Sequence, residues 1–281
     1  MSVTDARVRR HELNTDFTWV DRSGPFRRIT PAQARSYDEL GFFLLEDAFT
    51  PAELAAVRAA VDPFEAEVES FLEGVDGGRI FIARANEITF TTHLVTRAEA
   101  LRDFTKHAVF QDLGADLIGP DVRLYWDQAV YKKPGTEAPF PWHQDNGYAF
   151  VEPQQYLTCW VALTDATEEN GCPWVIPGLH RDGTLAHEDS PFGYVCLTDA
   201  ADAVPVPAKA GSVVVFSSLT PHCTGPNLTD GVRKAYIVQY APEGAAVVAT
   251  ADDGTTTRAS ATDPRRQFPV LAGGERVAPP D

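Results

Sequence analysis

The chain has few cysteines, a single methionine and no long apolar segment. It holds 4 Cys and 1 Met among 281 residues, and Cys159, Cys172, Cys196 and Cys223 show no paired CxxC spacing. Structural zinc sites and disulfide frameworks depend on such pairs, so both are disfavoured, and free thiols indicate a reducing compartment. No apolar run has the length of a signal-peptide core or a transmembrane helix. We therefore expect a cytoplasmic protein that does not associate with membranes.

Basic residues are also scarce relative to acidic ones. The chain has 24 Lys and Arg against 40 Asp and Glu, a formal net charge of -16. Such a charge repels nucleic acid and anionic membrane surfaces. Hydrophobic residues make up 44% and aromatic residues 10% of the chain, which is enough for a substantial core. We expect a partner that is a small molecule; composition does not predict the oligomeric state.

Two helix starts with the same chemistry are present in the first quarter of the chain. The segments "TPAQ" at 30–33 and "TPAE" at 50–53 match a capping box with proline at the first helical position. After the second start, apolar residues recur at steps of three and four from Leu54 to Phe71, and Pro63 is expected to bend or break this helix. Between the two helices, "GFFLLED" predicts a short buried strand.

From about residue 122 the pattern changes to short apolar or alternating runs separated by turn residues. We expect strands near 122–131, 156–163, 173–176, 212–216 and 234–240. Regular short strands behind a helical segment predict an α+β, mainly β fold with a sandwich or closed jelly roll. The expected organisation is a loose N-terminal arm over 1–28, one domain over 29–245, and a polar C-terminal loop or tail over 246–281.

Three His-x-Asp pairs are candidate metal sites, where about one His-x-acid pair is expected by chance. The pairs are His143/Asp145, His180/Asp182 and His187/Asp189. The last two lie in "IPGLHRDGTLAHEDSPFG", whose Gly, Pro, Asp and Ser content predicts a solvated loop without a rigid platform. The first lies in "PWHQDNGY", where an extended backbone points residues i and i+2 to one face.

A two-residue site needs a third ligand, and His222, at the end of the apolar run "SVVVF", is the best candidate. Two histidines and one carboxylate on one face leave positions on non-haem Fe(II) for a bidentate ligand and dioxygen. A 2-oxo acid that chelates iron needs a guanidinium for its far carboxylate, and Arg233 follows eleven residues later. Arg233 and Lys234 face opposite sides of their strand, so one of them points inward.

Three segments together resemble the phytanoyl-CoA dioxygenase family of Fe(II)- and 2-oxoglutarate-dependent oxygenases. They are "PWHQDNGY", "CWVALTDATEENGCPWVIPGLHRDG" and "TPHCTGPNLTDGVRKAYIVQY", and the similarity runs from about 37 to 241. The resemblance implies a double-stranded β-helix, or jelly-roll, core with flanking N-terminal helices. One departure is Leu179 in "PGLHRDG", where many members carry a small hydroxyl residue.

The resemblance also implies the roles of individual residues. His143, Asp145 and His222 match the family's iron ligands. The cosubstrate contacts implied for 2-oxoglutarate are Arg233, Thr224, Trp160 and Gln128. Related halogenases lack the carboxylate at the position of Asp145, so its presence favours hydroxylation or another oxidation over halogenation.

The implied function is a dioxygenase that uses Fe(II), 2-oxoglutarate and O₂ to oxidise a small metabolite, with release of succinate and CO₂. No acid–base residue is expected beyond the metal ligands. Tyr148 and Phe150 are candidates for the substrate pocket or, equally, for the barrel core. The alternative function is a cupin-like metal-binding or sensor protein without catalysis.

Overall fold

The computed structural model describes residues 8–251 and 253–277. Its largest element is an antiparallel sheet of ten strands. These strands are β1 Phe42–Leu45, β2 Arg79–Ile80, β3 Ala83–Arg84, β4 Ile88–Thr92, β5 Val122–Lys132, β8 Leu157–Ala162, β13 Val213–Ser217, β15 Arg233–Pro242, β18 Pro269–Ala272 and β19 Glu275–Arg276. The main path is β1-β13-β8-β15-β5-β4-β3-β2, and β18 pairs with β5.

A second antiparallel sheet faces the first. It runs in the order β12 Val204–Pro205, β9 Pro173–Val175, β14 His222–Thr224 and β6 Phe140–His143. Two small sheets complete the β structure: β7 Val151–Glu152 with β16 Ala246–Thr250 and β17 Thr256–Ser260, and the pair β10 Glu188–Ser190 and β11 Gly193–Val195. The mainly β fold with two facing sheets confirms the predicted jelly roll.

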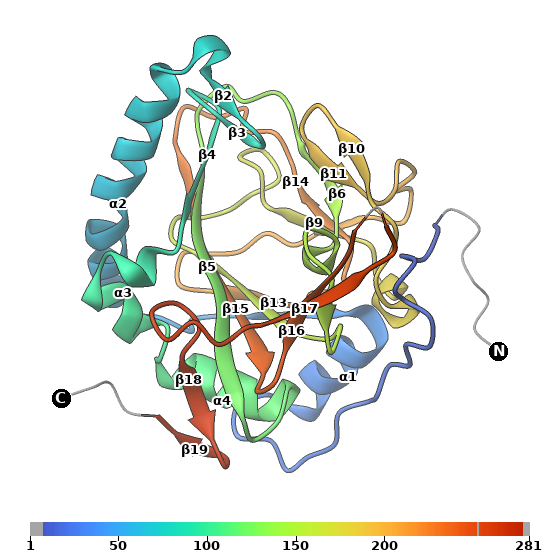
Figure 1. The fold of residues 1–281 in the computed structure, drawn as a ribbon. Coiled ribbons are helices and arrows are strands. Elements are labelled where there is room, and N and C mark those ends of the chain that lie inside the picture. Colours follow the sequence, from blue (N-terminus) through green and yellow to red (C-terminus); the bar gives the residue numbers. More distant parts are fainter. Residues whose placement is uncertain (1–7, 252, 278–281) are drawn as a thin grey trace.

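Helices cover the outer side of the larger sheet (Figure 1). They are α1 Pro31–Leu40, α2 Pro51–Glu73, α3 Glu99–Phe104 and α4 Ala108–Leu117, with 3-10 turns η1 Asp76–Gly78, η2 Leu94–Thr96, η3 Asp145–Gly147 and η4 Leu179–Asp182. Thr30 and Thr50 cap α1 and α2 through complete capping boxes, which confirms both predicted helix starts. Within the described part of the chain, no helix combines the length and apolar character needed to cross a membrane.

The predicted break at Pro63 is wrong, because α2 continues through it from Pro51 to Glu73. Proline removes one hydrogen bond, to the carbonyl four residues earlier. Pro63 and Ala59 both lie on the exposed face of α2, so water can satisfy the freed carbonyl. The helix therefore remains continuous through Pro63.

Strand alternation separates two cores on either side of the larger sheet. In β8 every residue is buried. Cys159 and Val161 pack with the helices, whereas Trp160 and Ala162 pack between the two sheets. Because successive side chains of a strand point to opposite faces, β8 contributes to both cores at once. All four cysteines are buried and free.

The N-terminal arm is packed, although we expected it to be loose. Residues 1–7 lie outside the described residues, and the rest, up to residue 28, contains no helix or longer strand. Trp19 is buried and donates its indole N–H to Asp38 Oδ1 at 3.1 Å. Asn14 Nδ2 donates to the carbonyls of Asp182 and Thr184. Asn14 and Trp19 thus attach the arm to the rest of the domain. Their spacing fits neither a helix nor a strand, so the sequence pattern does not predict these contacts.

The C-terminal segment, expected to be a loop or tail, instead contributes strands β16 to β19. Residues 252 and 278–281 of this segment lie outside the described residues. Phe268, Val270 and Leu271 are buried in the core beneath the helices, and β18 adds to the edge of β5. The polar composition hides these strands, because β17 is fully exposed and the buried apolar residues are few and scattered, at Ala246, Val248, Ala261 and the short run 268–271.

Candidate metal and cosubstrate site

Two histidines face each other across neighbouring strands of the smaller sheet. His143 ends β6, His222 begins β14, and the antiparallel register pairs them directly. Their ring centroids lie 4.1 Å apart. The expectation that His222 ends the apolar strand at 212–216 needs correction, since β13 belongs to the larger sheet and the chain crosses to the smaller one before His222. Local sequence does not encode which sheet a short strand joins.

Asp145 completes the cluster from a turn. Strand β6 ends at His143, so Asp145 lies not on an extended strand, as predicted, but at the start of η3. Its Oδ1 is 3.8 Å from His222 Nε2, and one ligand atom from each of the three residues lies within 4.8 Å of the others. Among the described residues, this is the group with the spacing of a metal site.

Hydrogen bonds leave the right atoms of these residues available for a metal. The Nδ1 atoms of His143 and His222 lie 2.8 and 3.0 Å from the carbonyls of Pro141 and Thr220, which directs both Nε2 atoms toward the cluster. Thr158 Oγ1 donates to Asp145 Oδ2 at 2.5 Å and leaves Oδ1 open. Burial and the adjacent His222 ring hold the pKa of His143 well below its usual range, so it stays neutral. These residues fit a divalent ion with two imidazole ligands and one carboxylate ligand.

The other two His-x-Asp pairs have structural roles. His180 is fully buried, not solvated as expected, and its Nε2 lies 3.1 Å from the carbonyl of Asp38. Its partner Asp182 forms an ion pair with Arg10 at 3.1 Å. His187 Nε2 accepts from the backbone N–H of Gln144 at 2.9 Å, and Asp189 is exposed on β10.

Arg233 is a buried cation in the same cavity. Its side chain is 1% exposed and its Cζ lies 5.3 Å from the Trp160 ring centroid. Nη1 donates to the carbonyl of Val130 at 3.3 Å, whereas Nε and Nη2 have no partner among the described residues. Burial lowers the pKa of Arg233 to about 10, still well above neutrality. A buried guanidinium with two partnerless nitrogens, Nε and Nη2, is suited to a carboxylate ligand.

The alternation predicted for Arg233 and Lys234 is confirmed. Arg233 faces the cavity, whereas Lys234 Nζ pairs with Asp62 Oδ1 on α2 at 2.8 Å. Thr224, on β14, also faces the cavity, and its buried hydroxyl has no partner in the described structure. These partnerless groups of Arg233 and Thr224 line the same cavity, and we refer to them as its polar end.

Sequence patterns did not single out Lys132 or Thr158. Lys132 is paired with Arg233 in the sheet register, is fully buried, and donates to the carbonyls of Thr224 and Gly225. Burial lowers its pKa to about 7. Thr158 lies two residues before Trp160, so strand alternation alone places it on the cavity face. The two-residue spacing from Trp160 is therefore sufficient to predict that Thr158 faces the cavity. The contacts of Lys132 join residues far apart in the chain, so they depend on the tertiary structure.

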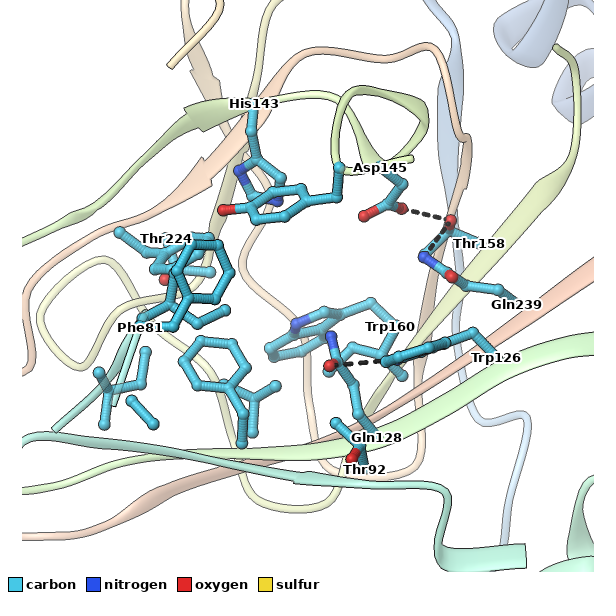
Figure 2. Close-up of a pocket in the computed structure, with 18 of the residues that line it drawn as sticks. Phe81, Thr92, Trp126, Gln128, His143, Asp145, Thr158, Trp160, Thr224 and Gln239 are labelled. Atoms are coloured by element: carbon cyan, nitrogen blue, oxygen red, sulfur yellow. Dashed lines mark hydrogen bonds between the residues drawn. The ribbon is translucent and has the colours of Figure 1, made fainter. Parts of the chain in front are cut away.

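The other predicted pocket residues divide into two groups. Trp160, Gln128 and Tyr148 line the cavity, and Gln128 Oε1 accepts from Trp126 Nε1 at 3.2 Å (Figure 2). Phe150 does not line it; its ring stacks on His11 with 4.8 Å between centroids. Leu179 lies in η4 within a separate small apolar cluster.

Comparisons with known proteins agree with this geometry. The sequence profile described as Phytanoyl-CoA dioxygenase (PhyH) matches residues 37–235. A methylphosphonate hydroxylase of Gimesia maris is 26% identical over 216 residues, which cover 75% of this chain and 80% of that protein. Phytanoyl-CoA dioxygenase domain-containing protein 1 of Mus musculus is 26% identical over 262 residues, covering 75% and 89%.

Solved structures show the same similarity. The non-haem alpha-ketoglutarate-dependent carbocyclase SnoK from nogalamycin biosynthesis superposes with a TM-score of 0.64 and 25% identity, covering 80% of this chain and 89% of that one. The non-haem monooxygenase ThoJ superposes with a TM-score of 0.59 and 27% identity, covering 82% and 84%.

Proposed function

Because this chain belongs to the phytanoyl-CoA dioxygenase family of Fe(II)- and 2-oxoglutarate-dependent oxygenases, we propose that it hydroxylates a small-molecule metabolite. The products are the hydroxylated substrate, succinate and CO₂. One observation carries the proposal. A His-Asp-His cluster faces the same cavity as a buried guanidinium, of which Nε and Nη2 have no partner among the described residues.

In this proposal His143, Asp145 and His222 hold the ferrous ion. Bound iron supplies the redox chemistry that couples decarboxylation of 2-oxoglutarate to insertion of one oxygen atom of O₂ into the substrate. Two imidazoles and one carboxylate would leave further coordination positions on the ion for the cosubstrate and O₂. Asp145 fills the position that halogenases leave open for chloride, which supports hydroxylation.

The cosubstrate is oriented by the polar end of the cavity. We assign the distal carboxylate of 2-oxoglutarate to Arg233, with Thr224 as a second donor, and we assign Trp160 and Gln128 to its flanks. Pairing the carboxylate with Arg233 removes the cost of an uncompensated buried cation. We also propose a cytoplasmic location, which the four buried free thiols support, and no nucleic-acid partner, which the net charge of -16 supports.

The proposal is tested with Arg233→Leu and the matched variant Lys234→Leu, which removes the neighbouring cation on the opposite face. Arg233→Leu should raise the concentration of 2-oxoglutarate needed for half-maximal succinate formation at least tenfold, because a hydrogen-bonded charge pair is lost. Lys234→Leu should leave it unchanged. An equal effect of the two variants would show that another residue binds the distal carboxylate.

A second measurement separates an oxygenase from a metal-binding or sensor protein. Anaerobic Fe(II) plus 2-oxoglutarate should produce the weak visible charge-transfer band of the chelate, and His143→Ala or Asp145→Ala should abolish both the band and succinate formation. Metal binding without the band or succinate would favour the non-catalytic alternative. Circular dichroism confirms that the variants remain folded.

A further inference from the structure

The cavity extends well beyond the metal and the polar end. Its volume is about 620 Å³, within the ~300–1,000 Å³ typical of pockets for drug-sized ligands. Arg233, Thr224 and the three candidate iron ligands account for one end. The remaining wall includes the end of α2, the β2–β3 hairpin and residues of strands β4, β5, β8, β13 and β15, and it is predominantly aliphatic and aromatic.

We infer that this space binds an uncharged, mainly apolar substrate, which enters between the end of α2 and the β2–β3 hairpin past Phe81. The inference rests on the proposed function and specifies its substrate class. It assigns Phe81 as a residue that determines specificity.

The scarcity of charged residues in the cavity lining supports an uncharged substrate. Among the described residues that line the cavity, Arg233 is the single Lys or Arg and Asp145 the single Asp or Glu. Both are committed to the cosubstrate and the metal. A charged group placed deeper in the apolar wall has no counter-charge, and burying an unpaired charge is strongly unfavourable.

The entrance is marked by exposed apolar side chains. Phe71 is 63%, Ile80 44% and Phe81 53% exposed, and all three line the cavity. Large exposed hydrophobic residues are few in the described structure, and Phe192, 42% exposed, lies near this hairpin with its ring under Arg84. Exposed apolar groups gathered around a cavity mouth indicate a surface that an apolar ligand covers.

Phe81 is held in place by its backbone and its neighbours. Its φ of 51° is the left-handed conformation that side chains other than glycine rarely adopt. Its ring lies 6.3 Å from that of Tyr148 and 5.7 Å from that of Tyr194, centroid to centroid. In Figure 2 Phe81 lies on the opposite side of the cavity from Gln128 and Trp126. A ligand between them contacts aromatic rings on both sides.

The basic residues of the hairpin are already engaged. Arg84 Nε pairs with Glu87 Oε2 at 2.8 Å, and Arg79 Nε donates to the carbonyl of Phe81 at 2.8 Å. An acyl-CoA thioester, whose phosphates would remain at this entrance, forms one arm of the test.

The experiment compares two probes with the same ring system, uncharged 9-anthracenemethanol and anionic 9-anthracenecarboxylate. Equilibrium dialysis is performed anaerobically with the full chain, Fe(II) and saturating 2-oxoglutarate. The alcohol should bind at least tenfold more tightly than the carboxylate. Phe81→Asp, in which aspartate tolerates the positive φ, should weaken alcohol binding at least tenfold. Leu228→Asp, at a residue that is 64% exposed and outside the cavity, should not.

Several outcomes would overturn the inference. These are equal or tighter binding of the carboxylate, displacement of the alcohol by octanoyl-CoA, or equal affinity in the wild type and Phe81→Asp. Failure of the proposed function has a different signature, namely absence of the iron–2-oxoglutarate band. In that case the probe comparison is repeated with metal-free Arg233→Leu, where the anion site is removed and the preference for the uncharged probe should persist.

Discussion

At the scale of single residues, the candidate iron site depends on hydrogen bonds that orient its ligands. Thr158 donates its hydroxyl to Asp145 Oδ2, and Gln239 Nε2 in turn lies 3.5 Å from Thr158 Oγ1 (Figure 2). The hydrogen bond from Thr158 thus fixes Oδ2 of Asp145, while Oδ1 faces His222. Ligand orientation of this kind commonly contributes a factor of about 10–100 to metal affinity.

Replacing Thr158 by valine tests this contribution. Thr158→Val keeps the shape of the side chain but removes the donor, so the affinity for Fe(II) should fall about tenfold. Anaerobic Fe(II) titration with a competing chelator measures it. Thr91→Val is the matched control, because Thr91 is a buried strand residue whose hydroxyl has no partner in the described structure. Equal iron affinity in the two variants would contradict the positioning role of Thr158.

At the scale of elements, the short turn η3 sets the position of Asp145. Gly147 closes this turn, and a Cβ atom there would lie 2.0 Å from Cε1 and 2.2 Å from Nε2 of His187. The His187 ring cannot easily move, since its Nε2 accepts from Gln144 and its Nδ1 lies 2.9 Å from the carbonyl of Leu185. The turn and the loop that carries His187 therefore fit together only with glycine.

Gly147→Ala should displace the turn and lower the affinity for Fe(II) at least tenfold, together with a loss of stability of about 1–3 kcal/mol from overpacking. Urea unfolding and metal titration measure the two effects. Gly231→Ala is the control, because a Cβ atom at Gly231 meets no heavy atom of the described residues within 4 Å. If both variants bind iron like the wild type, the turn does not position Asp145.

Element boundaries could be predicted where hydrogen bonding is local. The capping boxes at Thr30 and Thr50 involve residues three positions apart, and both helix starts are found as predicted. The sequence also predicts the apolar stripe of α2, but not which of its residues reach the cavity. Leu54, Val57 and Val61 are buried, whereas Phe71 reaches past the core to the cavity entrance. Periodicity cannot distinguish these two environments, because both favour apolar residues.

At the scale of the whole molecule, one buried carboxyl makes global stability depend on pH. Asp127 is fully buried and accepts from Tyr236 and the backbone of Val95, and its Oδ1 has no partner among the described residues. Burial raises the pKa of Asp127 from 3.8 to about 6. Between about pH 4 and 6, Asp127 is therefore protonated in the folded state and ionised in the unfolded state. The free energy of unfolding decreases as pH rises through this range, because the unfolded state binds fewer protons.

The variant Asp127→Asn should gain stability relative to the wild type as pH rises through this window. Between pH 4 and pH 7 the difference in unfolding free energy should shift in favour of the variant by on the order of 3 kcal/mol. Urea unfolding at a series of pH values measures this shift. Any effect of the substitution on stability that does not depend on pH cancels, because only the change with pH is compared. For Asp230→Asn, at an exposed position, the difference should vary by less than about 0.5 kcal/mol. A pH-independent difference for Asp127→Asn would contradict the prediction.

The opposite pH effect is expected from His180, so the total pH profile is a sum of opposing contributions. Burial lowers the pKa of His180 from 6.5 to about 4. The unfolded state takes up a proton first as pH falls, and the stability contributed by the neutral ring is lost between about pH 6.5 and 4. The effect of His180 cancels when the unfolding free energies of Asp127→Asn and the wild type are subtracted, because His180 is present in both proteins.

The sequence by itself determined the local and chemical features of this protein. Alternation placed Arg233 and Lys234 on opposite faces, and residue identity restricted the metal ligands to a few His-x-Asp pairs. Such properties depend on neighbours within a few positions or on the chemistry of one side chain. The family resemblance then selected His143, Asp145 and His222 from the possible sets.

Only the tertiary structure decided which distant segments meet. It placed His222 opposite His143 in the smaller sheet, set Lys132 beside Arg233, packed the N-terminal arm and the C-terminal strands, and joined Phe71 and Phe81 at the cavity entrance. These contacts join residues that are far apart in the chain, and many alternative pairings satisfy the same apolar pattern. The choice between them depends on how the two sheets pack, which is a property of the whole fold.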